Sequence, residues 1–81
     1  MRTQFTPRAA RDYKHLSPEL QALIDKQMSF LRQSLRHPSI RAKKYDEGAD
    51  IWQGRIDRDF RFYFHISGDV YYIITIIPHP K

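Results

Sequence analysis

Polar side chains that could act on a phosphodiester alternate with apolar ones in the segment Phe60–Ile66, which reads FRFYFHI. Strand side chains alternate between two faces, so one face of this segment is apolar and the other carries Arg61, Tyr63 and His65. The apolar face suits a protein core. A guanidinium, a phenol and an imidazole on the opposite face suit the binding and cleavage of a phosphodiester.

Arg61 is the strongest candidate for a cation that stabilises a reacting phosphate. An arginine among aromatic strand residues is costly unless it is paired or faces a cleft. The alternative is a structural ion pair with Asp57, Asp59 or Asp50, and alternation does not decide between the two. Arg55 could meet Arg61 across the sheet, but a structural bond from Arg55 to an acidic residue is the favoured interpretation.

Further candidates lie on either side of this segment. Lys43 and Lys44 are adjacent, so only one of them can point into any cleft of an extended chain, and the other is expected to be solvated. Tyr63 could stack on a base or cover a helix. His79 lies between two prolines and could act as a general acid or base, although a lone tail histidine is usually a surface residue.

A metal site is not expected. The four histidines show no paired spacing, no carboxylate cluster accompanies them, and the sequence has no cysteine. There is also no glycine-rich phosphate loop, so we expect neither a metal nor a cofactor.

Two helices are expected before the strands. Thr6-Pro7 and Ser17-Pro18 each place a capping side chain before a proline, which is typical of a helix start. The first helix is expected to reach about Leu16. The second is expected over residues 18–36, where apolar residues recur at helical spacing, and to end at His37-Pro38.

Strands are expected over residues 2–6, 52–56, 60–66 and 70–77, with an extended basic segment over residues 41–45. Residues 70–77 are β-branched and aromatic throughout, which predicts a central strand buried on both faces. The expected fold class is α+β: a single domain over residues 1–81, in which an N-terminal helical hairpin packs on a small, mainly antiparallel, twisted sheet of about four strands.

Positive charge is concentrated in the first half of the chain. The net charge is +5, and residues 1–45 hold ten Lys or Arg against three Asp or Glu. This distribution favours an anionic partner, either nucleic acid or an acidic protein segment, over a basic surface kept for solubility. We expect a cytoplasmic protein, since no signal peptide or membrane-spanning segment is recognisable.

The segment Trp52–Phe64, WQGRIDRDFRFYF, followed by a strand that ends in IIPH, resembles the RelE/ParE toxin superfamily over nearly the whole chain. The resemblance implies the toxin of a type II toxin–antitoxin system. RelE-like members cut mRNA in the ribosomal A site: the 2′-hydroxyl attacks the adjacent phosphate without a metal, leaving a cyclic phosphate and a 5′-hydroxyl. ParE-like members instead poison DNA gyrase.

The resemblance also assigns roles to residues. Arg61 matches the arginine that contacts the scissile phosphate, Lys43 and Lys44 match phosphate-binding or base-like lysines, and His79 matches an acid or base. A basic helix surface that grips ribosomal RNA is matched by Arg8, Arg11 and Lys14. The remaining residues expected to bind RNA are Arg55, Tyr63 and Lys81.

Two features depart from the family pattern. Pro80 stands where many members have arginine, and the C-terminal tyrosine of several RelE-like toxins is absent. Lys81 could supply the missing cation. A ParE-like gyrase binder or a weakened RelE-like binder is therefore the alternative. In either case the resemblance implies a toxin–antitoxin complex with an acidic antitoxin, and for the endonuclease also the ribosome and mRNA as partners.

Overall fold

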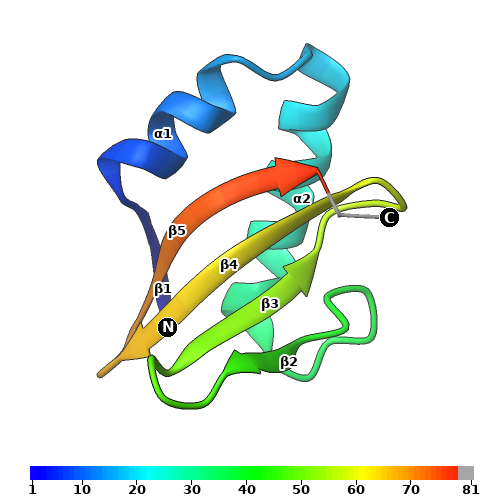
Figure 1. The fold of residues 1–81 in the computed structure, drawn as a ribbon. Helices are drawn as coiled ribbons and strands as arrows, with labels where there is room; N and C mark the ends of the chain where they lie inside the picture. The colour runs from blue at the N-terminus through cyan, green and yellow to red at the C-terminus, as the bar shows by residue number, and fades with distance from the viewer. Residues whose placement is uncertain (79–81) are drawn as a thin grey trace.

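The five strands of the protein form one sheet, which a computed structural model describes for residues 1–78 (Figure 1). The elements are β1 (Arg2–Phe5), α1 (Pro7–Lys14), α2 (Pro18–Gln33), β2 (Lys43–Asp46), β3 (Ile51–Arg55), β4 (Phe60–Ser67) and β5 (Val70–Pro78). The strand order is β1-β5-β4-β3-β2; β1 is parallel to β5 and the other pairs are antiparallel. The predicted α+β class is confirmed, and the basic segment, expected only to be extended, supplies a fifth strand.

Both helices begin where the sequence predicts. The side chain of Thr6 accepts a hydrogen bond from the Ala9 amide and that of Ser17 from the Leu20 amide, with a proline first in each helix. Both helices end early, however: α1 stops at Lys14 and α2 at Gln33.

The predicted end of the second helix at His37-Pro38 is wrong by three residues. Ser34 is extended, with φ −165° and ψ 132°, and its hydroxyl accepts a hydrogen bond from the Arg36 amide at 3.1 Å. A serine side chain that bonds nearby backbone competes with the helix, which explains the earlier stop.

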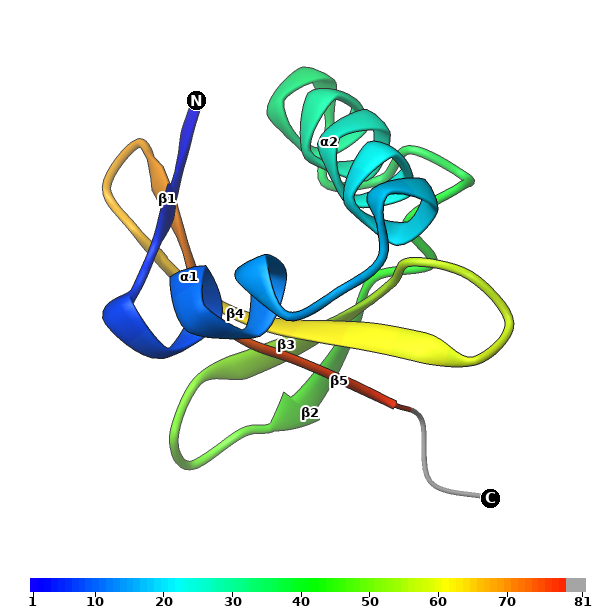
Figure 2. The same ribbon diagram turned by 90° about the horizontal axis from the view of Figure 1, so that it is seen from above.

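The helices cover one face of the sheet, as the view from above shows (Figure 2). The core between the two layers contains side chains with no exposed surface from both: Ile24, Leu31, Phe62, Phe64 and Ile73. Phe60 and Ile66 pack against this core, so the predicted apolar face of β4 is confirmed. The opposite face of the sheet is covered by no other element of residues 1–78 (Figure 2).

The expectation that residues 70–77 form a central strand buried on both faces is wrong. β4 is central, and β5 lies next to the edge strand β1. The register shifts between Tyr63 and Phe64, which face Thr75 and Ile73, so Ile74 is left unpaired as a bulge. Ile74 and Ile77 are only partly buried, because no helix covers the face on which they lie.

Beyond β1, α1 closes the free edge of β5. The Thr6 hydroxyl donates to the Ile74 carbonyl at 2.9 Å. The Asp12 Oδ2 atom accepts from the Thr75 hydroxyl at 2.7 Å and from the Ile76 amide at 3.1 Å. These bonds occupy the edge groups to which another strand would pair. None of the described helices is long and apolar enough to span a membrane.

Candidate nucleic-acid interface

Positive side chains gather around a pocket of about 320 Å³ on the uncovered face of the sheet. We call it the cationic pocket; its lining residues are Arg41, Lys43, Gln53, Gly54, Arg55 and Arg61. The sheet register brings them together, since Lys43 of β2 faces Gln53 of β3 and Arg55 of β3 faces Arg61 of β4. No carboxylate of the described chain lines this pocket. Arg41 and Arg55 also line a neighbouring pocket of about 730 Å³, to which Asp57 and Asp59 contribute. Four cations around a pocket with no carboxylate in its own lining form a site suited to phosphate.

Arg61 is held by the main chain and not by a carboxylate. Its Nη1 donates to the carbonyls of Asp57 at 2.6 Å and Phe60 at 2.9 Å. Within residues 1–78 it forms no ion pair, so the structural alternative of a bond to Asp57, Asp59 or Asp50 is not observed. The carbonyls orient the guanidinium but leave its charge uncompensated.

Arg55 lies directly opposite Arg61. The expected structural bond from Arg55 to an acidic residue is absent from the described part of the chain, and that interpretation is wrong there. Like charges that face each other across two strands destabilise a sheet by roughly 0.2–1 kcal/mol. The repulsion between Arg55 and Arg61 therefore does not favour the fold, whereas a bound anion would relieve it.

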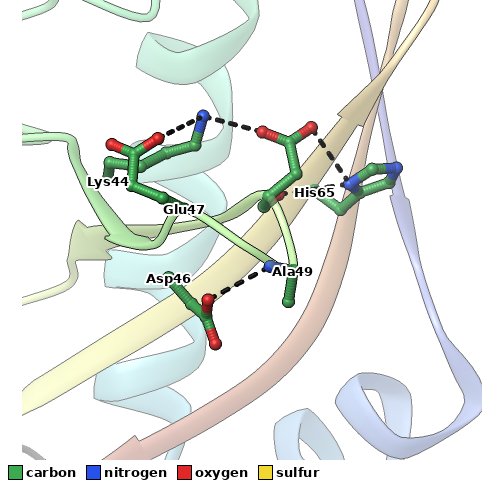
Figure 3. A network of polar contacts seen from close by, with 6 residues as sticks. Lys44, Asp46, Glu47, Ala49 and His65 are labelled. Carbon is green, nitrogen blue, oxygen red and sulfur yellow. Dashed lines mark hydrogen bonds and ion pairs between the residues drawn. The ribbon is translucent and has the colours of Figure 1, made fainter.

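The side chains of Lys43 and Lys44 point to opposite faces of the sheet, as strand alternation predicts. Lys43 lines the cationic pocket, whereas Lys44 turns to the other face, where its Nζ lies 4.8 Å from the centroid of the Trp52 ring. The Lys44 Nζ also contacts Asp50 at 2.7 Å and Glu47 at 3.9 Å (Figure 3). The hydrogen bond to Asp50 raises the pKa of Lys44. Lys44 is therefore not placed with Arg61.

His65 belongs with Lys44 and not with Arg61. Its Nδ1 lies 3.7 Å from Asp50 Oδ2 and 3.3 Å from the Asp50 carbonyl oxygen (Figure 3). The hydrogen bond from Lys44 lowers the pKa of Asp50, and His65 lowers it slightly further. We call Lys44, Glu47, Asp50 and His65 the Lys44 network. His65 lies about 13 Å along β4 from Arg61, by strand geometry.

Tyr63 faces away from the helices but is itself covered. It is buried, and its ring meets Tyr45 edge-on with centroids 4.8 Å apart. Burial raises the pKa of Tyr63. Tyr45 remains 62% exposed and is the ring that a base could reach, a residue that the sequence reasoning missed. Both tyrosines line an apolar pocket of about 260 Å³ with Ile51, Ile74, Thr75 and Ile77.

The other predicted RNA-binding residues lie apart from the cationic pocket. Arg8, Arg11 and Lys14 are exposed on α1, and Arg11 lines a separate pocket with His15 and Pro78. His79 and Lys81, together with Pro80, lie outside the described residues. Arg41 was missed by the sequence reasoning. In residues 1–78, no group of three His, Cys, Asp or Glu side chains could hold a metal ion.

Comparison with known proteins finds similarity in structure. No family model and no curated protein matches the sequence. An archaeal RelE–RelB complex from Pyrococcus horikoshii OT3 has TM-score 0.79 and 13% identity, over 95% of this chain and 92% of that one. The YoeB–YefM complex from Staphylococcus aureus has TM-score 0.78 and 17% identity, over 96% and 95%.

A YoeB/ParE toxin from Agrobacterium tumefaciens has TM-score 0.70 and 20% identity, over 99% of this chain and 100% of that one. The structural similarity therefore covers nearly the full length of each chain. Because the sequence identities are low, this similarity concerns the fold alone. The chain has the fold of the RelE/ParE toxin superfamily.

Proposed function

We propose that this protein is the toxin of a type II toxin–antitoxin system and cleaves mRNA on the ribosome without a metal. The observation that carries the proposal is the cationic pocket, where Arg41, Lys43, Arg55 and Arg61 converge without a carboxylate. Such a cluster suits the charge that grows on a phosphate under attack. The fold shared with RelE and YoeB toxins supports the same proposal.

The proposed reaction uses only groups of the RNA and the protein. The 2′-oxygen of one nucleotide forms a bond to the adjacent phosphorus and loses its proton. The bond from phosphorus to the 5′-oxygen of the next nucleotide breaks, and that oxygen takes up a proton. The products are a 2′,3′-cyclic phosphate and a 5′-hydroxyl. Negative charge accumulates on the non-bridging oxygens, where preorganised guanidinium groups stabilise it most.

Arg61 is the best-positioned group for that charge, because two main-chain carbonyls fix its guanidinium before substrate binds. Arg55 faces it from the neighbouring strand and Lys43 completes the cluster. Lys44 is assigned no part in the reaction, since Asp50 and Glu47 compensate its charge. Proton transfer by His79 stays a prediction from the sequence.

The proposed partner is an acidic antitoxin that covers the uncovered sheet face. Tyr45, Ile51, Ile74 and Ile77 line an apolar pocket on this face, and the cationic pocket shares the sheet with it. A segment that carries both apolar and acidic side chains matches that combination. The similar YoeB and RelE toxins were solved in complexes with YefM and RelB.

The test is primer extension on a defined mRNA in a purified translation system, with and without the protein. Cuts within codons that require ribosomes are expected from the wild type, and cutting slowed on the order of 10²-fold or more from Arg61→Ala. A matched control is Arg2→Ala, which removes an exposed arginine of β1 outside the cationic pocket. Cleavage by Arg61→Ala at the wild-type rate would contradict the proposed role of Arg61.

A non-enzymatic toxin that binds DNA gyrase is the second candidate. Pro80, which stands where many members of the resembled family carry arginine, favours it. This candidate predicts a DNA-damage response in cells that express the protein, while translation and mRNA remain intact. A folded sample that leaves every mRNA uncut in the purified system would favour it over the endonuclease.

A further inference from the structure

A second pocket adjoins the cationic pocket at the β2 edge of the sheet. Its volume is also about 320 Å³. We call it the edge pocket. Leu35, Ala42 and Trp52 supply apolar walls, and Arg36, His37 and Arg41 supply polar ones. No acidic residue of the described chain lines it.

Arg41 is the wall that both pockets share. Its backbone has φ +50°, a left-handed conformation that is uncommon for a residue other than glycine. Such strain persists only where the surrounding structure fixes it, and it concentrates at ligand-binding sites.

The chain just before Arg41 provides that constraint. The Ile40 carbonyl accepts from the Arg55 amide at 2.7 Å, and the Ile40 side chain is fully buried. The buried amide of Gln27 donates to the carbonyls of Ser39 at 2.9 Å and Arg55 at 2.7 Å. These bonds tie the loop to α2 and β3, so the wall at Arg41 is formed before any ligand binds.

His37 presents a fixed planar ring to the edge pocket. The imidazole stacks on Phe30 with centroids 4.0 Å apart and planes 8° from parallel. Its Nδ1 lies 3.2 Å from the Ser39 amide. Because a backbone N–H can only donate, Nδ1 accepts this bond. An aromatic ring locked by a neighbouring aromatic is a suitable platform for a nucleobase.

We propose that the edge pocket holds the base of the nucleotide next to the phosphate in the cationic pocket. The base lies against the His37 ring and the apolar walls, and Arg41 contacts the backbone between the two pockets. This inference rests on the proposed function, since it takes RNA as the substrate. The arrangement indicates the class of ligand. A nucleotide-binding surface needs a cationic site for the phosphate, a planar apolar site for the base and a polar group between them. The cationic pocket, the edge pocket and Arg41 supply these three parts.

Short synthetic mRNAs with one abasic nucleotide beside the cleaved phosphate test the proposal, on ribosomes with an empty A site. One template carries the abasic nucleotide on the 5′ side of the cleaved phosphate, and another carries it on the 3′ side. The wild type is expected to cut one of these two templates about ten-fold more slowly than the intact template. His37→Ala should show a similar loss on the intact template and little further loss on that abasic template. His37→Phe keeps a planar ring and should restore the rate.

The matched control is His65→Ala, since His65 belongs to the Lys44 network and lines neither pocket. Circular dichroism confirms that each variant is folded. Equal rates on intact and abasic templates, with Arg61→Ala still strongly slowed, would overturn this inference and leave the proposed function standing. If His37→Ala slows all templates alike, the pocket contacts a protein or ribosomal RNA and not the substrate base. A wild type that cuts no template would overturn both proposals.

Discussion

Two groups of charged side chains on β2, β3 and β4 handle charge in opposite ways. In the Lys44 network, a cation lies between Asp50 and Glu47, and Asp50 also meets His65. The cationic pocket, in contrast, collects four cations without a carboxylate among its described lining residues. Lys43 and Lys44 are neighbours in the chain, yet each belongs to a different group.

The difference separates charges that serve the fold from charges that serve a ligand. The cation of Lys44 has partners within the chain and covers the Trp52 ring, so it needs no further explanation. Arg55 and Arg61 face each other without an ion pair in residues 1–78. A folded chain gains nothing from that repulsion, which indicates that an anion from outside completes the site.

The largest expected effect belongs to Arg61→Ala. Loss of one preorganised cation is expected to slow single-turnover mRNA cleavage on the order of 10²-fold or more. The unfolding free energy should change by less than about 2 kcal/mol, because only two partly exposed hydrogen bonds are lost. Quench-flow cleavage and urea unfolding measure the two effects.

Lys44→Met is the control for this comparison, since it keeps an apolar stem against Trp52 but removes the charge. It should cleave at the wild-type rate. If Lys44→Met lost as much activity as Arg61→Ala, the division between the two groups of charged residues would be wrong.

A smaller effect, on stability, is expected from Gly54→Ala at the cationic pocket. A Cβ atom at position 54 would lie 2.3 Å from Cζ of Phe62, the fully buried residue that faces it across the sheet. Overpacking of this kind costs about 1–3 kcal/mol of unfolding free energy. The double variant with Phe62→Leu should recover part of that loss in urea titrations. Unfolding free energies that simply add would contradict the steric explanation.

The smallest effect is expected from Asp50→Asn, and it depends on pH. Asparagine tolerates the left-handed backbone of Asp50, φ +55°, so the variant removes mainly the charge. The folded pKa of Asp50 lies below its ordinary value of 3.8, so Asp50 stabilises the fold above that pH. The contribution is lost as pH falls through the lowered folded pKa.

Thermal melts between pH 2 and 7 measure this difference. The wild type should melt above Asp50→Asn at neutral pH, and the gap should close in acid. A gap that stays constant over the whole range would exclude the ion pair as its source.

The sequence predicted the fold and part of the site because both depend on local alternation. Period-two spacing placed Arg61 opposite the core face, and the same rule separated Lys43 from Lys44. The Thr6 and Ser17 caps predicted both helix starts. Each of these predictions needs only residues that are close in the chain.

The remaining features depend on tertiary structure. The turn after β3 determines which main-chain carbonyls Arg61 can reach, and its path follows from the folded chain. The unpaired Ile74 follows from the register of β4 and β5. The position of Arg41 requires a left-handed backbone fixed by Gln27 and Ile40 contacts. No spacing rule in the sequence encodes these long-range constraints.

The most direct test of the account is the salt dependence of RNA binding by the two groups of cations. Affinity for a 2′-O-methylated single-stranded RNA, which cannot be cut, would be measured over a range of KCl concentrations. Each phosphate contact contributes about 0.7 to the slope of log affinity against log salt. Arg55→Gln and Arg61→Gln should each reduce that slope by about this amount, and Lys44→Gln should leave it unchanged. A slope reduced by Lys44→Gln and unaffected by the two arginine variants would contradict the account.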